Sequence, residues 1–327
     1  MSILVTGAAG FIGFHLSLRL LSNGIKVIGI DNLNSYYDVK LKEARLTNLK
    51  NKANFEFYQC NISNRDELFS LLGDNHEITN IVHLAAQAGV RYSLVNPYAY
   101  VETNVMGQLV ILELCKKLPN LQHLVYASSS SVYGGNKKLP FSEDDRVDNP
   151  VSLYAATKKA DELMASAYAH LYEIPITGLR FFTVYGPWGR PDMSAFIFTK
   201  AIIEGSPIPV FNDGKMSRDF TYIDDIIDGI ERVIDINDSH KVRSMQHQVY
   251  NIGNNKPEPL LRYIEILEGS IGKSAIIEFQ PMQPGDVLET YADIAAIQHD
   301  FGFIPQVPIE QGIPMFVDWY KDYYKIK

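Results

Sequence analysis

Short apolar runs and amphipathic segments alternate along the first half of the chain. The runs are rich in Val, Ile and Leu and predict buried strands at Ile3–Thr6, Lys26–Asp31, Phe55–Cys60, Ile81–Leu84, Leu124–Ala127 and Ile176–Arg180. Helical spacing between them predicts helices at Phe11–Ser22, Leu41–Lys50, Arg65–Leu72, Pro97–Leu118 and Ser152–His170. Because strands alternate with helices, we predict an α/β fold with a doubly wound parallel sheet.

The pattern changes after Arg180, where prolines interrupt a mixture of short strands and helices. We predict a smaller C-terminal lobe in this part of the chain, with a role in binding a substrate. A helix at Asp224–Asp235 and a strand at Val249–Ile252 are regular enough to return to the main sheet. The predicted division is residues 1–180 with 224–252 for the main sheet, and residues 181–223 with 253–327 for the smaller lobe.

Composition and charge narrow the class of protein. The chain is 46% hydrophobic and 21% charged, as in an ordinary soluble globular protein. A net charge of −8 argues against a general nucleic-acid binder and gives no reason to expect an anionic membrane as a partner. No apolar run approaches the roughly 18 residues of a membrane span, and the first residues already form a strand, which leaves no room for a signal peptide. Cys60 and Cys115 lie far apart in apolar segments, so we expect buried thiols in the cytoplasm and no metal site.

Three glycines mark a candidate dinucleotide site. Gly7, Gly10 and Gly13 directly follow the first strand and open the first helix. A tight turn there lets the backbone approach a pyrophosphate, which the free N–H groups of the helix N-terminus can bind. Asp31 ends the second strand, where an acid binds the adenosine ribose of NAD and repels the 2′-phosphate of NADP. The sequence therefore predicts a Rossmann-like NAD site, and the alternative is that the glycines only pack the helix against the strand.

Tyr154 and Lys158 are the strongest catalytic candidates because of their context. They begin a predicted helix, and the strand before it ends in the hydroxyl side chains of Ser128–Ser131. Residues i and i+4 share a helix face, so the ammonium can lie beside the phenol. A tyrosine has a reference pKa of about 10, and it serves as a base near pH 7 only if the phenolate gains about 4 kcal/mol. A neighbouring ammonium and a positively charged nicotinamide ring can supply this stabilisation.

These motifs together resemble the extended short-chain dehydrogenase/reductases that act on nucleotide sugars. The resemblance is carried by Thr6–Gly13, Ser128–Gly134 and Tyr154–Lys158, and it covers essentially the whole chain. Four further stretches are similar to the UDP-glucuronate 4-epimerases, which make UDP-galacturonate: Asp31–Asp38, Ala86–Ser93, Phe181–Met193 and Arg218–Tyr222. The resemblance implies tightly bound NAD, no metal, and a homodimer joined through two helices, here Pro97–Leu118 and Ser152–His170.

The resemblance also implies which residues contact NAD. Lys158 would hold the nicotinamide ribose, and Asn61 stands where relatives usually have an aspartate that contacts the adenine. The implied set is Gly7, Gly10, Phe11, Ile12, Gly13, Asp31, Asn32, Asn34, Asn61, Ile62, Leu84, Ala85, Ala86, Asn104, Tyr154, Lys158 and Phe182.

The chemistry implied for the sugar is oxidation and reduction at C4. A 4-epimerase removes the C4 hydride and the O4 proton, turns the 4-keto sugar over, and returns the hydride to its other face. Tyr154 would take the O4 proton, Lys158 would favour the phenolate, and Ser129 would relay the hydrogen bond to O4. Ser129 can equally be a serine that caps the next turn, and its neighbours in the serine run remain alternatives for the relay.

Three hydroxyl residues indicate a carboxylate on the substrate. In the family that the sequence resembles, the nucleotide-sugar 4,6-dehydratases have Asp-Glu at the positions of Ser130 and Ser131, because elimination of water needs an acid and a base. Thr183 stands where epimerases of neutral sugars usually have asparagine. Neutral hydroxyls can donate hydrogen bonds to a carboxylate, which acidic side chains would repel. The alternative is that all three are ordinary loop hydroxyls near a strand end.

Arginines are the expected ligands of the diphosphate, because a guanidinium binds phosphate in a bidentate manner. Arg218 matches the phosphate-binding position of the family, and Arg91 and Arg190 are further candidates. Asp286 matches the position that holds the uridine ribose, whereas Gln283 replaces an arginine common in neutral-sugar epimerases.

The predicted function is that of a UDP-glucuronate 4-epimerase with a UDP-sugar as its partner and neither nucleic acid nor membrane. An epimerase of UDP-glucose or UDP-N-acetylglucosamine is disfavoured by Ser130, Ser131 and Thr183. A UDP-glucuronate decarboxylase shares the first half-reaction and is disfavoured by hydroxyls that would retain the carboxylate. A non-catalytic NAD(H) sensor would be expected to lack Tyr154 or Lys158.

Overall fold

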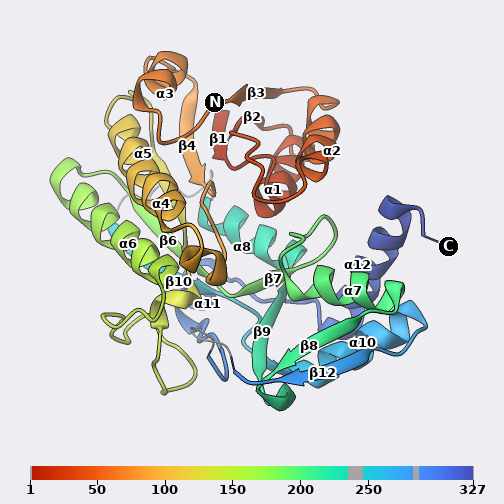
Figure 1. The fold of residues 1–327 in the computed structure, drawn as a ribbon. Helices are drawn as coiled ribbons and strands as arrows, with labels where there is room; N and C mark the ends of the chain where they lie inside the picture. The colour runs from red at the N-terminus through yellow and green to blue at the C-terminus, as the bar shows by residue number, and fades with distance from the viewer. Residues whose placement is uncertain (1, 235–245, 283–286, 327) are drawn as a thin grey trace.

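A seven-stranded parallel sheet forms the centre of the computed structural model, which describes residues 2–234, 246–282 and 287–326 (Figure 1). The strands lie in the order β10-β6-β5-β4-β1-β2-β3. Their bounds are β1 (Ser2–Thr6), β2 (Lys26–Asp31), β3 (Phe55–Gln59), β4 (Ile78–His83), β5 (His123–Ser129), β6 (Ile176–Phe181) and β10 (His247–Ile252). This is the order of a Rossmann-type sheet, in which the winding direction reverses between β1 and β4. The predicted α/β fold is confirmed.

Helices cover both faces of this sheet (Figure 1). One face carries α1 (Phe11–Ser22), α2 (Val39–Lys50), α8 (Ile223–Ile234) and α11 (Ala295–Phe301), and the other carries α3 (Arg65–Leu72), α4 (Pro97–Tyr100), α5 (Gly107–Cys115) and α6 (Leu153–Tyr172). Alternation along β1 explains this arrangement. Ile3 and Val5 pack into the core on the α1 and α8 side, while Leu4 packs into the core on the α5 and α6 side.

The segment predicted as one helix, Pro97–Leu118, is divided in the structure. α4 passes into a π-helical segment at Val101–Met106, and α5 ends at Cys115. π-Helical turns are rare and occur frequently at functional sites. Here the turn carries Asn104, whose buried side chain bonds the backbone of Gln87 on both sides, accepting from its N–H at 2.8 Å and donating to its carbonyl at 3.1 Å. Tertiary contacts of Asn104 therefore override the regular helical spacing.

β5 is longer than its predicted range Leu124–Ala127, and the difference affects the site. Its pairing with β6 continues through Ser128, opposite Arg180, and Ser129, opposite Phe181. The polar serines marked the end of the apolar run, but the strand continues because backbone pairing with β6 does not require apolar side chains.

Within the described residues, short strands and helices after β6 pack together outside the main sheet as a smaller lobe. One sheet has the order β11-β9-β7, and a second pairs β8 with β12. The bounds are β7 (Thr183–Tyr185), β8 (Pro207–Phe211), β9 (Ser217–Tyr222), β11 (Pro257–Pro259), β12 (Ile276–Gln280), α7 (Ser194–Glu204), α10 (Leu260–Ile271) and α12 (Ile309–Tyr324). Only Phe182 separates β6 from β7, so the chain passes directly from the main sheet into the lobe. This step brings Thr183 to the end of the central strands.

Candidate functional site

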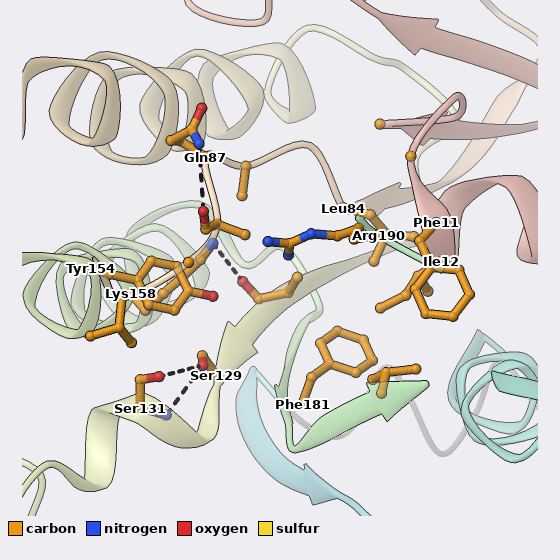
Figure 2. Close-up of a pocket in the computed structure, with 18 of the residues that line it drawn as sticks. Phe11, Ile12, Leu84, Gln87, Ser129, Ser131, Tyr154, Lys158, Phe181 and Arg190 are labelled. Carbon is orange, nitrogen blue, oxygen red and sulfur yellow. Dashed lines mark hydrogen bonds between the residues drawn. The ribbon is translucent and has the colours of Figure 1, made fainter. Parts of the chain in front are cut away.

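A cavity of about 440 Å³ lies at the carboxyl ends of the central strands (Figure 2). Ligands of doubly wound sheets bind at this edge, next to the point where the winding reverses. The cavity is lined from the main sheet by the segments after β1, β2, β4 and β5 and by the start of α6. From the smaller lobe it is lined by residues that include Thr183, Arg190 and Arg218.

The glycine turn between β1 and α1 has the geometry of a pyrophosphate site. Gly7 has a φ of +72°, and its N–H donates to the Ile30 carbonyl at 2.7 Å. A Cβ on Gly13 would lie 2.1 Å from the Gly7 oxygen, so only glycine allows this close approach. α1 begins after Gly10 without a side-chain cap. Its N-terminal N–H groups therefore remain available to an anion in the cavity.

Asp31 is fixed at the end of β2 by two backbone N–H groups. Its carboxylate accepts from Ala9 at 3.1 Å and from Leu33 at 2.8 Å. Lys42 of α2 also lines the cavity, although the sequence analysis did not select it. Its ammonium donates to the carbonyl and side-chain oxygens of Asn34, at 2.9 and 2.8 Å, and burial lowers its pKa. The dinucleotide end of the cavity thus holds one fixed carboxylate and one ammonium.

Tyr154 and Lys158 line the opposite side of the cavity from Phe11 and Ile12 (Figure 2). α6 begins just before them, where Ser152 caps the helix by accepting from the Ala155 N–H at 3.1 Å. The side chain of Lys158 is buried, and its ammonium donates to the Ala127 carbonyl of β5 at 2.9 Å. This bond fixes the face of α6 that carries Lys158 against the end of β5.

The serine run divides between two environments. The Ser128 hydroxyl donates to Glu162 at 2.7 Å in a buried position. The Ser129 hydroxyl donates to the Ser131 hydroxyl at 3.1 Å and accepts from the Ser131 N–H at 3.2 Å (Figure 2). Successive side chains of a strand point to opposite faces, which separates Ser128 from Ser129. Ser129, Ser130 and Ser131 all line the cavity.

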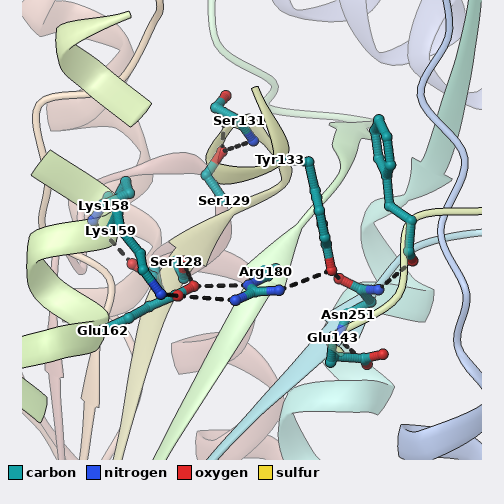
Figure 3. Close-up of polar contacts among 12 residues, drawn as sticks. Ser128, Ser129, Ser131, Tyr133, Glu143, Lys158, Lys159, Glu162, Arg180 and Asn251 are labelled. Atoms are coloured by element: carbon teal, nitrogen blue, oxygen red, sulfur yellow. Dashed lines mark hydrogen bonds and ion pairs between the residues drawn. The ribbon is translucent and has the colours of Figure 1, made fainter. Parts of the chain in front are cut away.

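A buried polar network lies behind the serines (Figure 3). Arg180 donates to both carboxylate oxygens of Glu162, at 2.8 and 2.9 Å, and to the Tyr133 hydroxyl at 3.0 Å. Tyr133 donates to the side chain of Asn251 in β10 at 2.6 Å. Burial opposes ionisation of Glu162, but Arg180, Ser128 and Lys159 together outweigh it and hold the pKa of Glu162 below its usual range. This network cannot be recognised in the sequence, because its partners are far apart in the chain.

Tyr36 is a second cavity residue that the sequence analysis did not select. Its hydroxyl donates to Asp192 at 3.1 Å, and Asp192 also binds Arg190, whose Nε lies 3.0 Å from the carboxylate. Burial and the Asp192 charge raise the pKa of Tyr36 to about 12. This cluster joins the segment after β2 to the segment after β7 across the cavity. The absence of a side chain at Gly89 makes room for the Tyr36 hydroxyl, since a Cβ at this position would lie 2.9 Å from that hydroxyl.

Most of the predicted site residues line the cavity, and three of the described ones, Asn61, Asn104 and Arg91, do not. Asn61 bonds Glu102, at 3.5 Å, and Asn104 lies beneath the cavity wall. The Arg91 guanidinium lies over the Phe211 ring, at 4.5 Å from its centroid. Asp286 lies outside the described residues, as does Gln283.

Within residues 2–234, 246–282 and 287–326, no group of three or more His, Cys, Asp or Glu side chains could hold a metal ion. In the same described part of the chain, no helix is long and apolar enough to cross a membrane.

A cavity with a glycine turn, a fixed acid and a Tyr–Lys pair can hold a nicotinamide beside a substrate, so that hydride passes between the two while the tyrosine exchanges a proton with the substrate. That combination defines a short-chain dehydrogenase-like enzyme with a dinucleotide cofactor. Comparison with known proteins gives the family. The chain belongs to the NAD dependent epimerase/dehydratase family, whose model matches residues 3–253. The predicted family and the predicted NAD cofactor are confirmed.

Relatives of known name resemble the chain over nearly its full length. A probable UDP-glucuronate 4-epimerase of Rhizobium meliloti is 46% identical over 99% of this chain and 98% of its own. UDP-glucuronate 4-epimerase 1 of Arabidopsis thaliana is 45% identical over 99% of this chain and 77% of its own. The crystal structure of UDP-glucuronic acid 4-epimerase from Bacillus cereus, with UDP-glucuronic acid and NAD, has a TM-score of 0.91 at 36% identity and covers 99% of this chain and 100% of its own.

Proposed function

We propose that this chain is a UDP-glucuronate 4-epimerase, which interconverts UDP-glucuronate and UDP-galacturonate. The observation that carries the proposal is the gathering of Ser130, Ser131 and Thr183 at the cavity that Tyr154 and Lys158 also line. Relatives that are 45–46% identical over nearly the whole chain bear this name. The three hydroxyls distinguish a uronate from a neutral sugar.

NAD fits the main-sheet side of the cavity. The glycine turn suits the pyrophosphate because the close Gly7–Gly13 approach leaves the uncapped N-terminus of α1 facing the cavity, and the Asp31 carboxylate suits the adenosine ribose. NAD supplies hydride acceptance and hydride return at C4 of the sugar. We assign NAD binding to residues 1–180 with 224–252, and substrate binding to residues 181–223 with 253–327.

Proton transfer at O4 is assigned to Tyr154. Its phenolate takes the O4 proton as C4 is oxidised and returns it as C4 is reduced. Lys158 favours the phenolate through its positive charge, which the Ala127 carbonyl holds in place. Ser129 relays the hydrogen bond to O4, and its bonds to Ser131 fix its direction.

Retention of the carboxylate is assigned to Ser130, Ser131 and Thr183. The 4-keto form of the sugar is a β-keto acid, which loses carbon dioxide when its carboxylate turns perpendicular to the ketone. Hydrogen bonds from neutral hydroxyls restrict that rotation without placing a second negative charge beside the carboxylate. This physical requirement favours epimerisation over decarboxylation.

The diphosphate is assigned to Arg218, with Arg190 and Arg91 as further cationic residues and Asp286 for the uridine ribose. Arg218 lines the cavity. Arg190 lines it too, and its charge is partly balanced by Asp192. The cavity thus offers guanidinium groups to an anion in a chain whose net charge is −8.

A homodimer through residues 97–118 and 152–170 completes the proposal. Large apolar side chains are exposed on these segments and directly next to them, and a partner's equivalent surface would cover them. They are Leu94, Val95, Tyr98, Val101, Met106, Leu163, Leu171 and Tyr172. Sedimentation analysis would test this assembly. We also propose a cytoplasmic location, where the buried thiols of Cys60 and Cys115 stay reduced.

The test of function is conversion of UDP-glucuronate, with the product sugar identified by NMR. Turnover of UDP-glucuronate should exceed that of UDP-glucose by about a hundredfold or more in kcat/KM. Each buried donor left without its partner costs about 1–3 kcal/mol, and each 1.36 kcal/mol is about tenfold. Thr183→Val keeps the shape and removes one donor, so it should reduce the preference, whereas Thr47→Val on the exposed surface of α2 should not. Comparable kcat/KM for the two sugars would overturn the carboxylate assignment.

A further inference from the structure

Tyr154, Lys158 and Asp161 lie on one face of α6. Their spacing of four and then three residues places them in a single row, because residues three and four apart are neighbours on a helix. The Asp161 carboxylate lies 3.1 Å from the Lys158 ammonium. Lys158 therefore has two partners on opposite elements, the Ala127 carbonyl of β5 and the Asp161 carboxylate of its own helix.

Asp161 is enclosed, and its charge acts mainly on Lys158. The residue is 1% exposed, and Lys158 is 4% exposed. One oxygen of Asp161 binds Lys158, and the other has no hydrogen-bond partner within the described part of the chain. The adjacent acid, Glu162, is already paired with Arg180. Burial raises the pKa of Asp161 to about 6, against the opposing effect of Lys158, so the carboxylate is charged at neutral pH.

We propose that Asp161 is a positioning residue that balances the charge of the Tyr154–Lys158 pair. Its carboxylate holds the ammonium in the ion form and cancels part of the positive field that Lys158 exerts on the phenol. The catalytic consequence rests on the proposed function: an epimerase must take the O4 proton and also give it back. A phenolate that is too strongly stabilised is a weak base, and a tyrosine titrating near the working pH does both tasks.

Other titratable side chains lie around this row. The side chains that face it from α6 and from the neighbouring strands and helix keep one charge state near neutral pH. Burial holds the pKa of His83 at about 3 and that of His247 at about 4, and it raises those of Tyr100 and Tyr126 far above neutrality. Glu162, Lys159 and Arg180 are held charged as ion pairs. A change in pH dependence on substitution of Asp161 is therefore attributable to the row.

Loss of the Asp161 charge should move the whole pH profile towards acid. The phenolate would form at lower pH, because the opposing negative charge is gone. Lys158 would also lose its proton at lower pH, because its counter-ion is gone. Tyr154 and Asp161 are two helical turns apart, about 10 Å, and Coulomb's law at an effective dielectric constant of about 20 gives a shift of about one pH unit.

The experiment compares Asp161→Asn with the wild-type holoenzyme. Asparagine has the shape of aspartate without its charge, and Asp161→Ala serves as a second variant if the amide prevents folding. The matched control is Asp318→Asn, which removes the same charge from an exposed position on α12. The acid limb of the kcat/KM profile should move to lower pH by about one unit in the Asp161 variants, and the alkaline limb should move further because Lys158 lies closer to Asp161. Both limbs should stay in place in the control.

A second measurement does not depend on turnover. Tyrosinate absorbance is titrated in each protein and in its Tyr154→Phe companion, and the difference isolates the phenol of residue 154. Its titration should shift to lower pH in Asp161→Asn. A difference titration and a rate profile that are both unchanged would overturn the role of Asp161. If the wild type fails to epimerise UDP-glucuronate while the difference titration shifts, the proposed function fails and the charge balance stands.

Discussion

Removal of one charge from the buried Glu162–Arg180 pair should destabilise the protein by about 3–5 kcal/mol. Both side chains are 4% exposed, and two hydrogen bonds of 2.8 and 2.9 Å join them. Arg180 cannot escape by losing its proton, because Glu162 and Tyr133 raise its pKa further against the effect of burial. Glu162→Gln therefore leaves a guanidinium ion buried without a counter-ion of equal strength.

The hydrogen bonds of Glu162 lead to a similar loss of stability for Glu162→Gln. Its two oxygens accept from Ser128 at 2.7 Å, from Lys159 at 3.3 Å and twice from Arg180. A glutamine offers one acceptor oxygen, and its amide nitrogen would face a donor. At least one buried N–H loses its partner at a cost of about 1–3 kcal/mol, and the uncompensated charge adds to it.

Urea unfolding near neutral pH measures the effect, with NAD at one concentration in all samples because bound NAD stabilises the folded state. The pKa of Glu162 is lowered in the folded state, so its contribution is present above the unfolded value of about 4.3 and is lost as pH falls below it. The control is Asp228→Asn, which breaks the exposed Asp228–Arg232 pair and should cost less than about 1 kcal/mol. Equal losses in the free energy of unfolding for Glu162→Gln and Asp228→Asn would refute the role given to burial of the Glu162–Arg180 pair.

Three further predictions concern the site and the buried histidines. Tyr154→Phe should abolish turnover while leaving UDP-glucuronate binding by calorimetry largely intact, because only the proton acceptor is removed; near-normal turnover would exclude Tyr154 as the base. Gly13→Ala should yield protein without bound NAD, measured by extraction and absorbance, since the added methyl meets the Gly7 oxygen at 2.1 Å; normal NAD content would contradict the glycine-turn geometry. Burial lowers the pKa of His123 to about 3, so the unfolded chain alone takes up its proton as pH falls below 6.5. Stability should fall by at most about 1.4 kcal/mol per pH unit for this residue, and His123→Gln should flatten urea-unfolding stability against pH by that amount.

Local features of the sequence determined the framework of the protein. Apolar runs of strand length and helical spacing located α1, β2 and α3 with the bounds that the structure has. Gly7, Gly13 and Asp31 predicted the dinucleotide turn, because a tight turn and a strand-end acid depend on residues close together in the chain. Prolines obscured β8 and β11, and the pairing of these strands with β12 and β9 depends on partners far away in sequence.

Long-range contacts decided the interior of the site. The register of β5 against β6 turned Ser128 towards Glu162 and left Ser129 at the cavity. Four consecutive serines in the sequence do not indicate which of them faces which side of the strand. The Glu162–Arg180 pair and the Tyr36–Asp192 contact join residues on different elements, and their charges look like ordinary surface charges in the sequence. The sequence by itself determined which residues are able to transfer a proton and bind NAD or substrate, since this ability depends on residue type and local spacing. Tertiary structure decided how those residues are oriented and which charges balance them, because burial and pairing arise only when distant segments pack together.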